Sequence, residues 1–233
     1  MSQSKEANQP MSEYLSGLKR AEEFMAVGFP KQEDWQNSPA VYAEGKLSIC
    51  GHSVMEDWEA PYMEELAKLA TSNGGVVLEV GFGLGLSASY IQSKPIDKHI
   101  IIEANADVFK KLQEFAQTAE KKVEPLFGFW QDAISSIPDE SVDGIFFDTY
   151  PLSEADVHPT SAIPFFKEAY RILKKGGVFT YFSCEVDDFS PYHLEMLQAA
   201  GFEDIHKKVF PMNTPETCWY WSSDTMVVPI IRK

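Results

Sequence analysis

The fold can be inferred from one segment, Val76-Val77-Leu78-Glu79-Val80-Gly81-Phe82-Gly83-Leu84-Gly85-Leu86-Ser87. Its first half is apolar and rich in β-branched residues, which predicts a buried strand. The closely spaced glycines that follow let the backbone turn tightly and approach a ligand without a Cβ in the way. A helical pattern begins directly afterwards, at Ala88, Tyr90 and Ile91. A strand, a glycine turn and a helix in this order are typical of the first βα unit of a nucleotide-binding domain.

Acidic residues follow several other predicted strands. The apolar run from His99 ends in Glu103, and an acid at about 20 residues after a glycine turn commonly hydrogen-bonds a ribose hydroxyl. Asp132 follows a predicted strand at 123–127, and Asp148 ends one at 142–147. Ligands of open α/β sheets bind outside the carboxyl ends of the strands. We therefore expect Glu103, Asp132 and Asp148 to face a common ligand site.

The remaining pattern completes an α/β chain. A fifth strand is expected at 178–183, and 204–209 with 219–232 are expected to form a closing antiparallel pair. Helices are predicted at 54–70, 106–119, 164–173 and 190–201, together with a short amphipathic helix from Tyr14 to Met25. Lys174-Lys175-Gly176-Gly177 is interpreted as a glycine C-cap of the helix before it.

Composition and charge restrict the class of protein. The chain has 233 residues, of which 44% are hydrophobic, and a formal net charge of −15. This charge disfavours binding to nucleic acid or to an anionic membrane. The irregular spacing of Cys50, Cys184 and Cys218 suggests neither a disulfide framework nor a metal site. With no leader or membrane-spanning segment apparent, we expect a cytoplasmic location.

We expect one globular unit with an N-terminal extension. Residues 1–10 are polar and predicted to be disordered, 11–75 to form a helical or lid region, and 76–233 to form the main domain. In the extension, Ser53 and Glu56 form a capping-box pattern that predicts a helix start near Val54.

On that helix, Met55, Glu59 and Met63 would lie four residues apart in a single row. A carboxylate flanked by methionines at the margin of an apolar face is costly if it stays unpaired. Glu59 therefore either points to solvent, as most helix glutamates do, or faces a pocket and meets a cation there.

Several segments of the chain resemble guanidinoacetate N-methyltransferase, a family of class I S-adenosylmethionine-dependent methyltransferases. The specific segments are Met55-Glu56-Asp57-Trp58-Glu59-Ala60-Pro61-Tyr62-Met63 and Asp148-Thr149-Tyr150-Pro151-Leu152. The resemblance also includes Leu78 to Gly83, which is generic to methyltransferases, Pro95 to His99, Ile102 to Asn105 and Leu173 to Val178, and extends more weakly to Cys218-Trp219-Tyr220 and the C-terminal strand. The resemblance runs through most of the chain from about Trp35 onward.

The resemblance implies a Rossmann-like, mostly parallel seven-stranded sheet whose last strand is antiparallel, with S-adenosylmethionine as cofactor and no metal. It places Glu59 and Asp148 as two carboxylates that grip a substrate guanidinium, with Asp148 also beside the cofactor. The residues that it places around the cofactor are Trp35, Met55, Met63, Gly81, Phe82, Gly83, Leu84, Gly85, Leu86, Ser87, Glu103, Ala104, Gln131 and Asp132.

Two acids suit a guanidino substrate chemically. A guanidinium is protonated at neutral pH and is a poor nucleophile. Two carboxylates can accept its hydrogen bonds in a fixed fork, and one can take a proton as the new C–N bond forms. We expect Asp148 to be the proton acceptor and Glu59 the principal clamp.

One segment departs from the family pattern. After the strand at 178–183 the family has a longer loop, whose first amides hold a substrate carboxylate. Here Cys184 and Glu185, the predicted substrate contacts, are followed by Asp187 and Asp188. Because acids repel a carboxylate, these residues favour a substrate with a neutral or cationic far end, such as agmatine.

Other functions remain open. The partner is expected to be a small guanidino compound, guanidinoacetate or a different guanidine, although methylation of arginine in proteins is an alternative. A dinucleotide-dependent oxidoreductase would need a second mononucleotide-binding half, which the pattern does not show. A non-catalytic cofactor-binding module would have little reason to hold both Glu59 and Asp148. A monomer and a homodimer are both compatible with the sequence.

Overall fold

A computed structural model describes residues 28–153, 156, 160–218 and 220–233. The predicted tail at 1–10, the predicted helix from Tyr14 to Met25 and Trp219 lie outside the described residues. Within the described part of the chain, no helix is both long enough and apolar enough to cross a membrane.

The core of the molecule is a seven-stranded sheet with the order β6-β5-β4-β7-β8-β10-β9. Strands β4 to β8 are parallel to one another, and β10 lies between β8 and β9, antiparallel to both. The predicted class I methyltransferase topology is therefore confirmed. The strands are β4 (Val76–Val80), β5 (Lys98–Glu103), β6 (Lys122–Phe127), β7 (Val142–Phe147), β8 (Leu173–Tyr181), β9 (Asp204–Pro211) and β10 (Thr225–Arg232).

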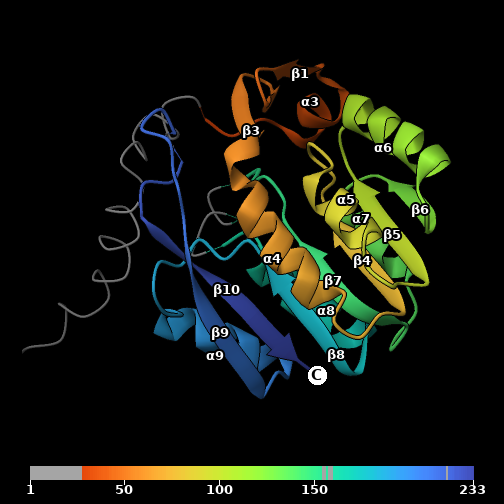
Figure 1. Ribbon diagram of the computed structural model, residues 1–233, viewed down its shortest axis with the longest axis vertical. Coiled ribbons are helices and arrows are strands. Elements are labelled where there is room, and N and C mark those ends of the chain that lie inside the picture. Colours follow the sequence, from red (N-terminus) through yellow and green to blue (C-terminus); the bar gives the residue numbers. More distant parts are fainter. Residues whose placement is uncertain (1–27, 154–155, 157–159, 219) are drawn as a thin grey trace, which may run out of the picture.

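Helices cover both faces of this sheet (Figure 1). Successive side chains of a strand point to opposite faces, so Val77 of β4 joins one apolar core and Leu78 joins the other. The first core contains side chains of α4 (Ala60–Ala70), α5 (Leu86–Gln92) and α6 (Ala106–Thr118). The second contains side chains of α8 (Phe166–Ile172) and α9 (Pro191–Ala200). Both faces being buried explains why β4 and β5 consist mainly of apolar residues.

A small antiparallel sheet stands above the end of the main sheet where its parallel strands finish (Figure 1). It consists of β1 (Ala40–Ala43), β2 (Lys46–Ile49) and β3 (His52–Glu56), and α3 (Gln32–Asn37) lies beside it. The sequence predicts a helical region here, but the chain forms strands because tight turns at Gly45 and Gly51, both with positive φ, reverse it. Strands of four or five residues are too short to show a clear alternation of apolar and polar residues in the sequence.

The helix expected from Val54 starts later than predicted. Met55 belongs to β3, and a 3₁₀ turn at Asp57–Glu59 precedes α4. The capping box is formed by Glu56 and Glu59, not by Ser53 and Glu56. Met55, Glu59 and Met63 are therefore not a row on one helix.

The predicted glycine cap after α8 is also wrong. Leu173 is already extended, and residues 174–177 belong to β8. The amide of Gly176 donates to the carbonyl of Lys233 at 2.6 Å, so the segment gains a strand partner in place of a helix cap.

The packing of α4 on β7 generates a test of the fold. A Cβ added to Gly144 in β7 would lie 1.7 Å from the carbonyl oxygen of Ala70 at the end of α4. We expect Gly144→Ala to lower the free energy of unfolding by about 3 kcal/mol, measured by urea denaturation, because two backbones must separate. Gly177→Ala is the comparison and should cost less, since a Cβ there would lie 2.7 Å from the Leu173 side chain and 2.9 Å from the Lys174 carbonyl oxygen, both farther than 1.7 Å. Equal losses in both variants would contradict this packing.

Candidate functional site

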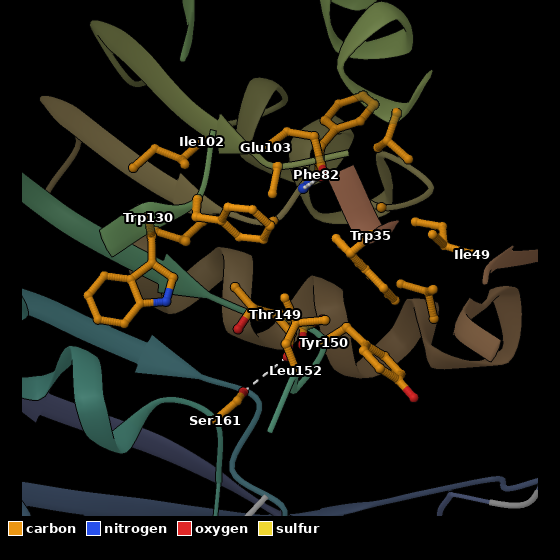
Figure 2. Close-up of a pocket in the computed structure, with 18 of the residues that line it drawn as sticks. Trp35, Ile49, Phe82, Ile102, Glu103, Trp130, Thr149, Tyr150, Leu152 and Ser161 are labelled. Atoms are coloured by element: carbon orange, nitrogen blue, oxygen red, sulfur yellow. Dashed lines mark hydrogen bonds between the residues drawn. The ribbon is translucent and has the colours of Figure 1, made fainter. Parts of the chain in front are cut away.

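A cavity opens at the carboxyl ends of β4, β5 and β7, beneath the small sheet (Figure 2). Its lining comes from the turn after β4, the end of β5, the segment after β6, the segment after β7 and the small sheet with α3. The described lining residues are Gln32, Trp35, Leu47, Ile49, Val54, Met55, Val80, Gly81, Phe82, Gly83, Ser87, Ile102, Glu103, Ala104, Val108, Gly128, Phe129, Trp130, Gln131, Asp148, Thr149, Tyr150, Leu152, Asp156 and Ser161.

The turn after β4 is pressed against the segment that leaves β7. Gly81 has a φ of +94°, and a Cβ on it would lie 1.9 Å from the carbonyl oxygen of Asp148. On the other side of this contact, the amide of Asp148 donates to the carbonyl of Val80 at 2.9 Å. Only glycine meets both requirements, and the contact brings Asp148 to the glycine-rich turn.

Glu103 closes the far side of the same turn. Its Oε2 accepts the amide of Phe82 at 3.0 Å, and its Oε1 accepts the amide of Asn105 at 2.7 Å. Burial raises the pKa of Glu103, and backbone amides, those of Asn105 and Phe82 foremost, oppose that rise. A carboxylate has about four lone-pair positions, so Glu103 can accept further hydrogen bonds from a ligand in the cavity.

Aromatic and thioether groups cover the cavity. The rings of Trp35 and Tyr150 are stacked with centroids 4.6 Å apart, and both residues are labelled in Figure 2. Asn105 fixes the backbone beneath Trp35, because its amide group donates to the Trp35 carbonyl at 2.7 Å. From β3, the Sδ atom of Met55 lies 3.5 Å from the amide nitrogen of Leu84.

Glu59 is a buried carboxylate at the junction of the 3₁₀ turn and α4, with 3% of its surface exposed. Its Oε1 accepts the amide of Glu56 at 2.8 Å and the hydroxyl of Tyr220 at 2.6 Å. Burial, followed by the negative charge of Asp148, raises the pKa of Glu59 to about 8. The charge of Asp148 therefore acts on Glu59.

Asp148 is half-buried at the end of β7. Burial, and then the charge of Glu79, raise its pKa to about 7. Glu79 is fully buried below the glycine turn, where it accepts the hydroxyl of Ser87 and lies 2.9 Å from the Nε2 atom of His99. Within the described residues, no ion pair includes Glu59 or Asp148. Two carboxylates that share a site with no cationic partner form a receptor for a cation.

The structure gathers many of the predicted site residues and leaves others outside the cavity. Those in the lining are Trp35, Met55, Gly81, Phe82, Gly83, Ser87, Glu103, Ala104, Gln131 and Asp148. Leu84, Gly85, Leu86, Met63, Asp132, Glu59, Cys184 and Glu185 are not among the lining residues. Met63 is fully buried in the core of α4, and Asp132 is exposed on α7 (Trp130–Ala133). Glu59 is outside the lining, but the charge of Asp148, which is in the lining, raises the pKa of Glu59.

The acidic segment after β8 is turned towards other elements. Glu185 accepts hydrogen bonds from the amide and hydroxyl of Ser190, at 2.9 and 2.7 Å, and its Oε1 lies 3.1 Å from His193 Nδ1. Asp187 accepts from the hydroxyl of Thr225, and Asp188 pairs with Lys207. These contacts hold the segment against α9, β9 and β10, so the structure does not bring Glu185 into the cavity.

Two contacts at the site have no signal in the sequence pattern. Tyr220 reaches Glu59 from 161 positions away, and the segment that carries it shows no periodicity. Glu79 and His99 pair across two neighbouring strands. In the sequence each is a polar residue within an apolar run, and nothing indicates that the two meet. Among the described residues, no three His, Cys, Asp or Glu side chains are arranged to hold a metal ion.

Comparisons with known proteins agree with this geometry. The profile of the family described as "Guanidinoacetate N-methyltransferase" matches residues 23–233. Protein arginine N-methyltransferase 2 of Yarrowia lipolytica is 36% identical over 163 residues, which cover 65% of this chain and 33% of that protein. The protein of the same name from Saccharomyces cerevisiae is 29% identical over 138 residues, covering 56% and 32%. The chain thus matches about a third of the length of these relatives.

Solved structures share the fold at low sequence identity. Spermidine synthase from Thermotoga maritima aligns with a TM-score of 0.56 and 18% identity, over 81% of this chain and 65% of that one. TYW2 from M. jannaschii, solved in complex with AdoMet, aligns with a TM-score of 0.56 and 15% identity, over 84% and 87%. At these identities the likeness establishes the architecture only.

The raised pKa values of Glu59 and Asp148 predict a pH-dependent stability. A carboxyl group whose pKa is higher in the folded than in the unfolded chain stabilises the fold below its unfolded pKa, near 4. That contribution is lost as the pH rises through the folded values of about 7 and about 8. We therefore expect stability to fall between about pH 5 and about pH 8.5, and Asp148→Asn to reduce the fall. Urea denaturation measures both, and Asp97→Asn, at an exposed position, should leave the wild-type pH profile in place.

Proposed function

The chain belongs to the guanidinoacetate N-methyltransferase family, and from this membership we propose that it methylates a guanidino nitrogen held between Glu59 and Asp148. The cofactor is S-adenosylmethionine, which the family uses. The observation that carries the proposal is a pair of carboxylates with raised pKa values, Glu59 buried beside the cavity and Asp148 half-buried in its lining. Such a pair is satisfied by a planar cation with several N–H donors.

The residues of the cavity fit the cofactor. Glu103 stands at the end of β5 with lone pairs available to ribose hydroxyls, and Gly81 leaves no Cβ between the turn and a bound ligand. Trp35, Met55 and Phe129 provide apolar contact area for a nucleoside. The acids in the lining, Glu103, Asp148 and Asp156, suit a ligand that carries positive charge.

The chemistry requires little beyond positioning. When bound, S-adenosylmethionine supplies a methyl group on a positively charged sulfur, which is already activated for displacement. Glu59 and Asp148 fix the guanidinium plane by charge-assisted hydrogen bonds, which selects the nitrogen that faces the methyl group. As that nitrogen forms its new bond to carbon, it releases a proton. Asp148, which lines the cavity, is the acid placed to accept this proton.

Glu59 takes the role of clamp in this proposal. Its Oε1 is held by two donors, so the side chain cannot reorient freely during the reaction. A charge pair at about 4 Å contributes roughly 4 kcal/mol at an effective dielectric near 20, before the cost of desolvation is subtracted. Binding of a guanidinium should therefore lower the pKa of both acids and release protons.

Guanidinoacetate is the first substrate to assay. The sequence favours a neutral or cationic far end because of the acids at 185–188, but their contacts with α9, β9 and β10 turn that charge away from the cavity. An arginine side chain in a protein is the second candidate, and the name of the fungal relatives favours it. Both substrates present the same guanidino group to Glu59 and Asp148.

A substrate panel tests the proposal. Purified protein with S-adenosylmethionine is incubated separately with guanidinoacetate, agmatine, arginine, taurocyamine and an arginine-containing peptide, and methylated products are identified by mass spectrometry. Methylation of at least one guanidine supports the proposal, and the preferred compound identifies the far-end chemistry. Binding of S-adenosylhomocysteine without turnover on any guanidine would instead indicate a non-catalytic module, and binding of NAD alone an oxidoreductase.

Removal of the Glu103 charge should weaken cofactor binding. We expect Glu103→Gln to raise the Kd for S-adenosylhomocysteine about 10- to 100-fold, measured by isothermal titration calorimetry, because hydrogen bonds to a charged acceptor are the stronger ones. Glu114→Gln, at an exposed position on α6, should bind like the wild type. An unchanged Kd in the Glu103 variant would remove Glu103 from the cofactor site.

Removal of the proposed base should abolish most turnover. We expect Asp148→Asn to lower kcat about 100-fold or more at saturating cofactor and substrate, because a general base contributes roughly 10²–10⁴-fold. Glu59→Gln should act mainly by raising the KM for the guanidine. Glu195→Gln, on the exposed face of α9, is the matched control. Wild-type kcat in Asp148→Asn would rule out Asp148 as the proton acceptor.

A further inference from the structure

The segment between β9 and β10 delivers a tyrosine to the carboxylate clamp. Tyr220 donates its hydroxyl to Glu59 Oε1 at 2.6 Å, across a sequence separation of 161. The segment starts at Met212, whose amide donates to the carbonyl of Asp224, so the two ends of the loop are tied together. Tyr220 therefore reaches Glu59 from a closed loop.

Both donors to Glu59 use the same oxygen. The amide of Glu56 donates to Oε1 at 2.8 Å, and the hydroxyl of Tyr220 donates to Oε1 as well. No described residue donates a hydrogen bond to Oε2, yet Oε2 is not among the fully buried polar atoms that lack a partner. Among the described residues, the first oxygen of Glu59 is therefore occupied by two donors and the second has none.

Tyr220 is itself held in place by the start of α4. Its ring stacks on Trp58 with centroids 6.0 Å apart and planes 29° apart. The indole nitrogen of Trp58 donates to Glu56 Oε2 at 3.1 Å, and Glu56 Oε1 pairs with Lys46 at 3.0 Å. Lys46, Glu56, Trp58 and Tyr220 thus form one connected set of contacts that reaches Glu59 through the Glu56 amide and the Tyr220 hydroxyl.

We propose that Tyr220 is a positioning residue for substrate, which orients Glu59 so that its second oxygen meets the guanidinium. This inference rests on the proposed function, because it assigns Tyr220 to the same clamp. A hydroxyl on Oε1 removes one of the two ways in which the carboxylate could face its ligand. It also leaves Asp148, for which no side-chain donor is found in the described residues, as the acid that exchanges protons.

The charged and titratable groups around Glu59 determine what a loss of Tyr220 should do. Asp148 and Glu56 raise the pKa of Glu59 through their charge, whereas the Tyr220 hydroxyl and the Glu56 amide lower it by hydrogen bonding. Cys218 lies close enough for the charges of Glu56 and Glu59 to raise its own pKa. Lys46 is engaged with Glu56. Removing the hydroxyl therefore moves the pKa of Glu59 further upward.

The test is Tyr220→Phe, which removes the hydroxyl and keeps the ring that stacks on Trp58. We expect the KM for the guanidine to rise about tenfold or more, because a hydrogen bond to a charged group is lost. The acidic limb of the kcat/KM profile should move to higher pH, which a merely structural residue would not cause. The Kd for S-adenosylhomocysteine should stay within about twofold, since Tyr220 is not in the cavity lining.

Two comparisons isolate the mechanism. Tyr192→Phe removes a hydroxyl from an exposed tyrosine on α9 and should change neither KM nor the pH profile. In a Glu59→Gln background, Tyr220→Phe should add little further loss, because Tyr220 acts through Glu59. Additive losses, or an unchanged KM and pH profile in the single variant, would overturn the proposal. Trp58→Phe keeps the hydroxyl but loosens its support, and is expected to shift both quantities in the same direction by less.

A titration without catalysis separates this inference from the proposed function. The carboxyl carbon of Glu59 is followed by ¹³C NMR in the cofactor-free protein, assigned by its absence in Glu59→Gln. A higher pKa in Tyr220→Phe than in the wild type supports the role of Tyr220 even if no guanidine is methylated. An identical pKa in the two proteins would refute it even if the wild type is an active methyltransferase.

Discussion

The site depends on the repulsion between two carboxylates that the fold forces together. Glu59 and Asp148 lie on different elements, one before α4 and one after β7, and burial raises the pKa of each. Neither acid has an ion-pair partner among the described residues. No cationic side chain in this part of the chain therefore neutralises their charges. In the proposed function a substrate guanidinium would neutralise these charges, so that substrate binding would also relieve the repulsion.

The framework that holds this pair is a set of short backbone contacts. The glycine turn touches the chain after β7 so closely that Gly81 has no room for a side chain. On the other side, the capping box of Glu56 and Glu59 makes one functional acid part of a helix start. Each acid is thus positioned by main-chain geometry, which is more rigid than a pair of long side chains on the surface would be.

Much of the fold could be predicted from the sequence, because β4, β5 and β7 are apolar runs of the right length and the glycine turn marks the first βα unit. The small sheet could not be, because β1 and β2 have four residues each and one exposed face. The position of Asp148 at a strand end and of Glu59 between two methionines marked both acids as candidates, but their pairing around a guanidinium followed only from the family resemblance. Tyr220 and the His99 partner of Glu79 depend on contacts between distant segments, which no local pattern encodes. The expectation that the acids at 185–188 face the substrate fails for a related reason. The sequence shows which residues are acidic but not the direction in which their side chains point.

The order of strands at the carboxyl-terminal edge has a kinetic consequence. β9 has only β10 as a strand neighbour in the sheet, and β10 comes later in the chain. On a growing polypeptide β9 must wait unpaired until β10 docks between it and β8. Tyr220 lies in the connection between these two strands, and Tyr62 of α4 donates to the carbonyl of Val227 in β10. The contact between Tyr220 and Glu59 therefore belongs to a part of the sheet that is closed by long-range strand pairing, which we expect to form slowly.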